Sequence, residues 1–425
     1  MMELIFHGGA GQVGRSCIEV KTSKSRILLD AGLWITSHGA EFPTDIEKID
    51  EIDAVIISHA HLDHTGALPR LKHQGLRCPI FANIETKKIS KILLKDSFKI
   101  SRIQHAHPGY GKDDIQSVMS QFRDIPFNKI EEFNDIKFKL IPSGHIPGSA
   151  AILIECEGER LLYTGDINST ETHLLKGANI QEDIDYLIIE STYGDRDHPN
   201  RKEQEQTFLN HVEKTIMRGG SVLIPAFAVG RAQELLLMLN DREFDVPIYL
   251  DGMARQIAEL MSSYPSLVKD SGALRNAIEK CNFIRDRDQR STILEKQCII
   301  ISTSGMVNGG PSLFYLGKLF NSEKNSILLT GYQAEGTNGK MLYDDGTVYI
   351  DGNLMHVKAD IEKFDFSAHS GMQELHSVVL DLNPKLTIVQ HGDKESIEKF
   401  AWWIGEQGLK SVVAEIDVKI TLHKD

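Results

Sequence analysis

The chain has 425 residues, 41% of them hydrophobic and 25% charged, which is typical of a globular protein long enough for two domains with sizeable cores. Its formal net charge of −13 excludes a uniformly basic nucleic-acid-binding protein, although a local basic groove or bound metal ions can still attract phosphates. Residues 1–6 lack the charged start of a signal peptide, and no run approaches the roughly 18 apolar residues that span a bilayer, so we expect a cytoplasmic protein without membrane contact.

The first part of the chain alternates short β-branched runs with turn residues. Such runs predict strands, whereas only residues 85–98 and 113–122 have the spacing of amphipathic helices. The predicted strands cover residues 4–6, 17–20, 26–29, 54–57, 136–141, 151–156, 161–163 and 186–189. We expect a sheet-rich domain with flanking helices over residues 1–194.

From about residue 194 helices and strands alternate. Residues 202–217 and 231–239 predict helices, and residues 221–224, 247–250, 298–302 and 326–330 predict buried strands. This rhythm favours a small parallel α/β domain over residues 195–356. After about residue 357 the pattern changes again, with a helix at 372–380, a strand at 386–390, a helix at 396–407 and a strand at 418–422. Histidines beside glycines at strand ends indicate that residues 357–425 rejoin the first domain.

The most informative segment is residues 58–66, SHAHLDHTG, which follows a short apolar run. On a tight loop His59 and His61 project the same way and can share one metal ion. Asp63 and His64, at the start of a helix, point to a neighbouring position, so two ions fit. Histidine nitrogens with few carboxylates and no thiolate suit zinc, and Asp63 also tolerates manganese or iron. The alternative is a polar turn in which Asp63 caps a helix.

Further candidate ligands stand beside small residues at strand ends, where backbone and side chain can approach an ion closely. Each of these segments taken alone has the pattern of an ordinary turn, and only together with the first motif do they indicate a dinuclear site. The four residues are His145 in SGHIPGS, Asp166 in YTGD, His369 in FSAHSG and His391 in VQHGD.

These motifs together resemble the metallo-β-lactamase fold and, within it, the β-CASP nucleases, relatives of the cleavage-and-polyadenylation endonuclease and of bacterial ribonuclease J. The resemblance covers nearly the whole chain and includes residues 9–17 (GAGQVGRSC), the strand end at Asp30, and Glu190 in IESTYGDR. Residues 225–234 (PAFAVGRAQE) and 304–310 (SGMVNGG) resemble the inserted β-CASP domain. The resemblance implies an α/β fold, a metallo-β-lactamase αββα sandwich with an inserted parallel α/β β-CASP domain.

The resemblance also implies a set of roles for a site with two zinc ions (Zn²⁺), with Mn²⁺ as the alternative metal. It puts His59, His61 and His145 on one ion, Asp63, His64 and His391 on the other, and Asp166 between them. It makes His369 the general acid, Glu190 its partner, and Asp30 a residue that orients a ligand or hydroxide. Asp63, as a ligand of the reacting site, is counted with these catalytic residues. Taken alone, Glu190 would be a capping carboxylate and Asp30 a turn residue.

Other segments allow two interpretations each. Ser304, Gly305 and Met306 precede a predicted helix and either bind an RNA phosphate through backbone N–H groups or form a plain helix-entry loop. Arg231 is either a phosphate contact or half of a structural ion pair.

Two more segments depart from the ligand and family patterns. His105 and His107 form a second H-x-H, but no Asp-His follows them, so we predict that they bind no metal. Residues 331–340 (GYQAEGTNGK) end in Asn-Gly-Lys where the family more often has Leu-Gly-Arg or Leu-Ala-Arg, which leaves the role of this loop open.

The resemblance implies a zinc-dependent ribonuclease that hydrolyses RNA phosphodiester bonds, as an endonuclease, a 5′–3′ exonuclease or both. A histidine in the last motif, here His391, marks the RNA-processing members. The alternatives are another metallo-β-lactamase-fold hydrolase that acts on small molecules, and a non-catalytic subunit of a processing complex. The expected partners are an RNA substrate and either a second copy of the chain or an RNA processing or decay complex.

Overall fold

The computed structural model describes residues 2–36, 39–44, 46 and 49–422, which divide into two compact units. Unit 1 comprises Met1–Glu171, Gly177–Asp197 and Ala368–Asp425, and unit 2 comprises Thr172–Lys176 and His198–Ser367. Unit 2 is therefore an insertion in the sequence of unit 1.

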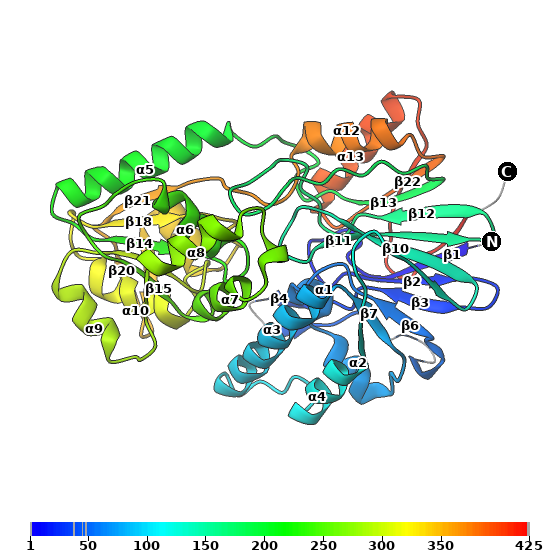
Figure 1. The fold of residues 1–425 in the computed structure, drawn as a ribbon, viewed down its shortest axis with the longest axis horizontal. Helices are drawn as coiled ribbons and strands as arrows, with labels where there is room; N and C mark the ends of the chain where they lie inside the picture. The colour runs from blue at the N-terminus through cyan, green and yellow to red at the C-terminus, as the bar shows by residue number, and fades with distance from the viewer. Residues whose placement is uncertain (1, 37–38, 45, 47–48, 423–425) are drawn as a thin grey trace. The chain divides into compact units, whose positions relative to one another are not determined.

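Unit 1 contains two seven-stranded sheets (Figure 1). The first has the order β24 (Lys419–Leu422), β1 (Met2–Gly8), β2 (Cys17–Lys21), β3 (Arg26–Leu29), β6 (Ala54–Ile56), β7 (Ile80–Ala82) and β8 (Phe122–Asp124). The second has the order β23 (Ser411–Val413), β22 (Leu386–Gln390), β13 (Tyr186–Glu190), β12 (Glu159–Tyr163), β11 (Ala150–Cys156), β10 (Ile136–Pro142) and β9 (Ile130–Phe133). In each sheet antiparallel pairs give way to parallel ones, from β3 to β8 and from β12 to β23.

Helices cover the outer faces of both sheets, and the inner faces pack against each other (Figure 1). Leu4 and Phe6 of the first sheet meet Phe138 and Ile152 of the second in the central core. The strands at the centre of each sheet are buried on both faces, which explains their continuous apolar runs. The helices over the first sheet are α1 (Leu62–Thr65), α2 (Leu68–Gln74), α3 (Ile84–Ile103) and α4 (Lys112–Gln121), and those over the second are α12 (Met372–Leu382) and α13 (Lys394–Glu406). The remaining elements of unit 1 are η1 (Ile49–Glu51) and the hairpin β4 (Trp34–Thr36) and β5 (Gly39–Glu41). The expected αββα sandwich is confirmed.

Unit 2 is built on one parallel sheet, as the alternation of helices and strands predicted. Its order is β16 (Asn282–Phe283), β15 (Ile248–Asp251), β17 (Ile299–Ser302), β14 (Val222–Pro225), β18 (Ser326–Leu329) and β21 (Asp360–Lys363). The connecting helices are α5 (Arg201–Met217), α6 (Arg231–Asn240), α7 (Met253–Ser262), α8 (Ser271–Lys280), α9 (Gln289–Thr292), α10 (Gly310–Leu319) and α11 (Asn338–Asp345). A hairpin of β19 (Thr347–Ile350) and β20 (Asn353–His356) and the short helices η2 (Pro265–Leu267) and η3 (Ile293–Glu295) complete the unit.

The last strand of unit 2 lies beyond the boundary expected from the sequence. The sequence predicts a return to the first domain at residue 357, whereas in the structure β21 still pairs in parallel with β18 of unit 2. Phe364 and Phe366, which follow β21, both pack edge-on against Phe208 of α5. Unit 2 therefore continues to Ser367. Throughout the described residues, each helix is too short or too polar to cross a membrane.

At Gly32 the backbone of one segment of unit 1 passes so close to that of another that there is no room for a side chain. The N–H of Gly32 donates to the Ser16 carbonyl at 2.8 Å, and a Cβ atom there would lie 1.6 Å from the carbonyl oxygen of Asp63. The overlap cannot be relieved by the movement of a side chain, because the nearest atoms are backbone atoms of Asp63 and Ser16. Gly32 thus holds the segments that carry Ser16 and Asp63 together.

We predict that Gly32→Ala lowers the free energy of unfolding by on the order of 1–3 kcal/mol, the cost of overpacking. Gly405→Ala is the matched control, because Gly405 lies inside α13 and a Cβ there meets nothing within 4 Å. That change should raise stability by about 0.5–1 kcal/mol, since alanine favours the helix. Urea unfolding of both variants tests this, and equal midpoints for the two would contradict it.

Candidate metal centre

The candidate ligands follow strands whose carboxyl ends share an edge. In the second sheet the adjacent parallel strands β12, β13 and β22 lead to Asp166, Glu190 and His391. In the first sheet the parallel strands β3 and β6 lead to Asp30 and His59. The sandwich therefore brings together segments that are far apart in the sequence.

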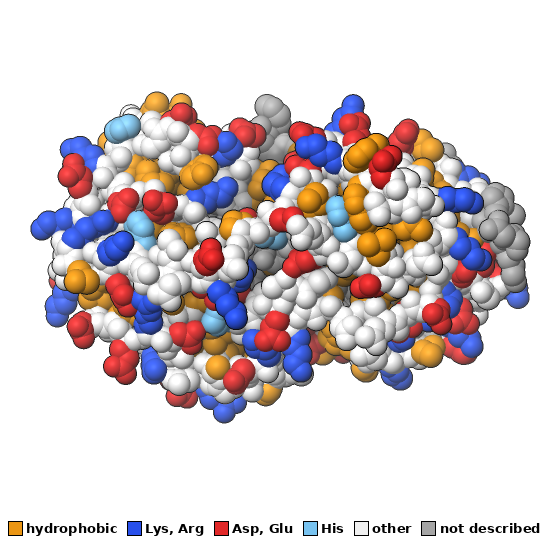
Figure 2. Space-filling view, turned by 90° about the horizontal axis from the view of Figure 1, so that it is seen from above, with side chains coloured by type: hydrophobic (Ala, Val, Ile, Leu, Met, Phe, Trp, Pro, Cys, Tyr) orange, Lys and Arg blue, Asp and Glu red, His pale blue; other side chains and the backbone are white. Residues whose placement is uncertain are grey.

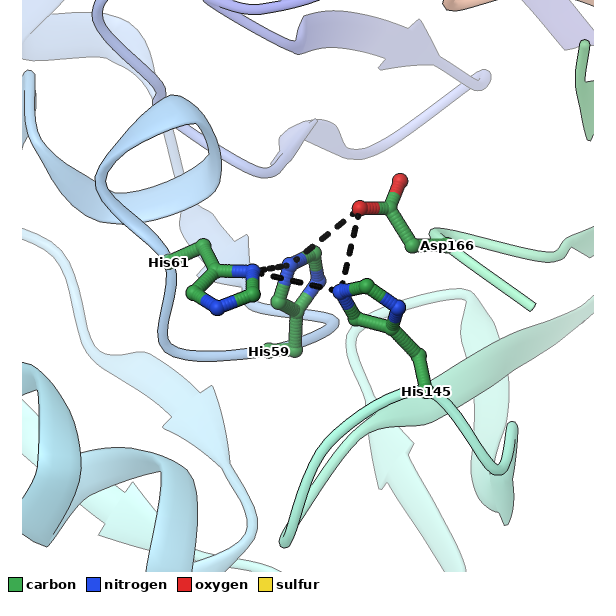
Figure 3. Close-up of side chains that lie close together, drawn as sticks. All are labelled: His59, His61, His145 and Asp166. Atoms are coloured by element: carbon green, nitrogen blue, oxygen red, sulfur yellow. Dashed lines mark hydrogen bonds and ion pairs between the residues drawn. The ribbon is translucent and has the colours of Figure 1, made fainter. Parts of the chain in front are cut away.

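Four side chains converge on one point (Figure 3). His59 Nε2 and His145 Nε2 each lie 3.2 Å from His61 Nδ1 and 3.5 Å from Asp166 Oδ2. A tetrahedral zinc ion with bonds of about 2.0–2.1 Å separates its ligand atoms by about 3.3 Å. The measured spacings match that value, so this group fits one tetrahedral metal ion.

A second group lies on the other side of the same carboxylate. His64 Nε2 is 3.3 Å from Asp166 Oδ1 and 3.7 Å from Asp63 Oδ2, and His391 Nε2 is 3.7 Å and 3.9 Å from the same two oxygens. Within the described chain His64 Nε2, His391 Nε2 and Asp166 Oδ1 are buried without a hydrogen-bond partner. Buried polar atoms without partners are costly, and a cation between them would satisfy all three.

The charges of the two groups also favour a cation. Burial, and then the neighbouring His64, hold the pKa of His59 well below its usual range, so its imidazole is neutral and suited to coordination. Burial would lower the pKa of His64, but the carboxylates Asp166, Asp63 and Asp30 raise it well above its usual range. The positive charge that these carboxylates stabilise can be a proton on His64 or a metal ion in its place.

Asp30 fixes the ring of His64 from behind. His64 Nδ1 donates to Asp30 Oδ2 at 2.7 Å, and Asp30 also accepts the Ser58 N–H and the Tyr163 hydroxyl at 2.7 Å. This wholly buried carboxylate leaves Nε2 of His64 directed at the site. The structure therefore puts Asp30 in contact with a candidate ligand.

Two other candidate ligands are oriented by groups that the sequence analysis did not identify. His391 Nδ1 lies 2.7 Å from the hydroxyl of Ser16, and His145 Nδ1 donates to the carbonyl of Ala368 at 2.8 Å. Ser16 belongs to the GAGQVGRSC motif on which the family resemblance partly rests, and this motif is the feature of the sequence that could have indicated Ser16. A backbone carbonyl such as that of Ala368 gives no signal in the sequence.

His369 and Glu190 form a pair at the edge of the metal groups. His369 Nδ1 is 3.0 Å from both carboxylate oxygens of Glu190, which also accepts the Ile167 N–H at 2.8 Å and the Thr192 hydroxyl. Burial alone would lower the pKa of His369, but the charge and hydrogen bond of Glu190 raise it to about 9. The imidazoles of His369 and His145 have centroids 4.5 Å apart. Thr192, two residues after Glu190, was missed in the sequence.

The remaining site candidates lie in unit 2. Ser304, Gly305 and Met306 form the loop between β17 and α10. Arg231 begins α6 and is buried, where its guanidinium pairs with Glu234. Such a contact is what the second interpretation of Arg231, a structural ion pair, requires.

The second H-x-H lies apart from these groups. His105 and His107 are both exposed in the segment between α3 and α4. Among the described residues neither belongs to a cluster of potential metal ligands.

Comparisons with known proteins agree with both the fold and the centre. The profile of the Metallo-beta-lactamase superfamily domain matches residues 19–191, that of the Beta-Casp domain matches residues 232–342, and that of the Zn-dependent metallo-hydrolase RNA specificity domain matches residues 354–416. A crystal structure of a protein of unknown function from Enterococcus faecalis V583 shares the fold at a TM-score of 0.63 and 16% identity, covering 99% of this chain and 100% of that one.

Several relatives match almost the whole chain, although the chain spans only part of the length of some of them. "Probable RNase MJ4" of Methanocaldococcus jannaschii is 40% identical over 99% of this chain and 100% of its own length. "RNase aCSPSF2" of Saccharolobus solfataricus is 34% identical, over 98% and 84%. "Cleavage and polyadenylation specificity factor 73" of Drosophila melanogaster is 31% identical, over 92% of this chain and 60% of that protein. With these matches, the chain belongs to the β-CASP family of metallo-β-lactamase-fold RNA hydrolases.

Proposed function

We propose that the protein is a ribonuclease that binds two zinc ions and hydrolyses RNA phosphodiester bonds. The observation that carries the proposal is the position of Asp166, whose two oxygens each face one cluster of histidines. A shared carboxylate between two ligand groups is suited to a pair of ions that together hold one phosphate.

In this proposal His59, His61 and His145 would hold one ion, Asp63, His64 and His391 would hold the other, and Asp166 would serve both. Three imidazoles and a carboxylate at tetrahedral spacing favour zinc over larger, oxygen-preferring cations. When bound, the ions supply an activated water at neutral pH and stabilise the charge that develops on the phosphate.

The chain's own residues handle the leaving group. Glu190 accepts a hydrogen bond from Nδ1 of His369, which keeps the transferable proton on Nε2. That proton passes to the departing 3′ oxygen of the RNA. Thr192 and the Ile167 N–H hold Glu190 in place, so they position the acid without touching the substrate.

For the substrate, we propose that Ser304, Gly305 and Met306 offer backbone N–H groups to an RNA phosphate. Arg231 serves instead to hold α6, because its charge is engaged by Glu234. On the face seen in Figure 2, Lys and Arg side chains are interspersed with Asp and Glu rather than gathered in one patch. With a net charge of −13, RNA binding should therefore be weak and strongly salt-dependent. Assembly with a second copy or with an RNA processing or decay complex stays a prediction.

The direct test is cleavage of 5′-labelled RNA that bears a hydroxyl, monophosphate or triphosphate, with and without a chelator. We expect cleavage that the chelator abolishes and that added Zn²⁺ restores. Mononucleotide release from the monophosphate substrate alone would identify a 5′ exonuclease, whereas internal fragments would identify an endonuclease. Intact RNA in every lane, with two zinc ions bound per chain, would refute the proposal.

His369→Ala should keep both metal ions and lose on the order of 10²–10⁴-fold in kcat, the usual contribution of a positioned general acid. The readouts are zinc per chain by elemental analysis and single-turnover cleavage. His105→Ala is the control, because that histidine is exposed and outside the ligand groups, and it should change neither quantity. Zinc loss in His369→Ala would mean that the residue is a ligand.

Asp30→Asn should weaken metal binding about 10–100-fold, as loss of the carboxylate behind a ligating histidine does. The amide can no longer supply the negative charge that the His64 N–H contacts at 2.7 Å. Tyr163→Phe, which removes one hydrogen bond to the same carboxylate, should have a smaller effect. Competition with a chromogenic chelator measures the metal affinity of both variants. A larger loss of affinity in Tyr163→Phe than in Asp30→Asn would contradict this role of Asp30.

A further inference from the structure

The Asn-Gly-Lys end of the loop at residues 331–340 makes contacts that the proposed function does not yet use. Asn338 is the first residue of α11, and its carboxamide bonds to residues outside the helix. Its Nδ2 donates to the carbonyl of Val307 at 3.2 Å and to the carbonyl of Tyr349 at 3.1 Å. Its Oδ1 accepts the Tyr349 N–H at 3.0 Å.

These contacts tie the loop between β17 and α10 to the hairpin of β19 and β20. The carboxamide pairs with both backbone groups of Tyr349, much as a neighbouring strand would. With its remaining N–H it reaches Val307 in the loop. An apolar side chain at position 338 can make none of these bonds.

The helix does not need Asn338 as its cap. Thr337 is the N-cap of α11, and its hydroxyl accepts the Lys340 N–H at 3.3 Å. The carboxamide of Asn338 is therefore committed to the loop and the hairpin rather than to the start of the helix.

The loop needs such support because Val307 has a φ of 59°, in the left-handed region that β-branched residues rarely adopt. Three successive carbonyls of the loop accept hydrogen bonds from residues 333–339. The Gly305 carbonyl accepts from Gln333 Nε2 at 3.2 Å, the Met306 carbonyl from the Gly339 N–H at 2.9 Å, and the Val307 carbonyl from Asn338.

These carbonyls of the loop accept hydrogen bonds, whereas several of its N–H groups have no acceptor among the described residues. Within the part of the chain that the structure describes, the N–H groups of Gly305, Met306 and Asn308 donate no hydrogen bond. Position 339 also requires glycine, because a Cβ there would lie 1.6 Å from Gln333 Oε1 and 3.1 Å from the Met306 carbonyl. The Asn-Gly pair thus fixes the conformation in which the loop presents these N–H groups.

We propose that Asn338 is a positioning residue for RNA binding, which holds the loop of residues 304–309 so that its N–H groups can donate hydrogen bonds to an RNA phosphate. The inference rests on the proposed ribonuclease function. Asn338 touches no substrate in this account, and it acts only through the loop.

The test compares Asn338→Ala with Asn325→Ala. Asn325 is a matched control, because its carboxamide likewise bonds only to backbone: it makes two bonds against the three of Asn338, accepting from the Ser221 N–H at 2.9 Å and donating to the Leu319 carbonyl at 3.0 Å. It lies before β18, at the opposite end of the sheet strands from the loop. Both variants lose comparable hydrogen bonds in unit 2, but only one of them loses support of the loop.

We expect Asn338→Ala to raise KM for a single-stranded RNA about tenfold, the effect of losing one or two net hydrogen bonds, with kcat within about twofold of the wild type. Hydrogen exchange of residues 305–308 should become faster. Asn325→Ala should lower the Tm by a similar amount and leave KM unchanged. The dissociation constant of the same RNA, measured in a His369→Ala background, should follow KM.

An unchanged KM in Asn338→Ala, a fall in kcat alone, or an equal rise of KM in both variants would overturn the inference and leave the ribonuclease proposal standing. A wild-type protein that cleaves no RNA would refute the ribonuclease proposal instead. The RNA dissociation constants of the two variants would then still decide the role of Asn338.

Discussion

The carboxylate of Asp166 is the constraint on which the rest of the site depends. It is buried, and its two oxygens face two separate sets of imidazoles, so neither set can move without disturbing the other. Burial would raise the pKa of Asp166, but His64, His391 and His59 hold it well below its usual range. An ionised carboxylate in a buried place requires positive charge around it, and the sandwich supplies the ligands for that charge from both of its sheets.

The candidate metal ligands could be predicted from the sequence because these residue types are concentrated in short segments. His59, His61, Asp63 and His64 lie within six positions, and single histidines or aspartates beside glycine at strand ends point to the rest. Parallel neighbouring strands explain why this works. Residues that follow such strands share an edge, whatever their separation in the chain.

The hydrogen bonds that orient the candidate ligands could not be predicted from the sequence, because they join residues that form no local sequence pattern. Ser16 and His391 are 375 positions apart, and the partner of His145 is a backbone carbonyl. Short strands were also missed: β7, β8 and β9 span three or four residues each, too few to show an alternation. The packing of Phe364 and Phe366 on Phe208, which extends unit 2 to Ser367, is a tertiary contact that no local pattern in the sequence shows.

The insertion of unit 2 sets an order in which the centre can assemble during synthesis. His59, His61, His145 and Asp166 all precede the main segment of unit 2, which begins at His198, so the first ligand set is present once residue 166 has been made. The second set requires His391, which follows that segment. A nascent chain therefore carries all four residues of the first candidate group before unit 2 is made, whereas the second candidate group can form only after His391 has followed unit 2.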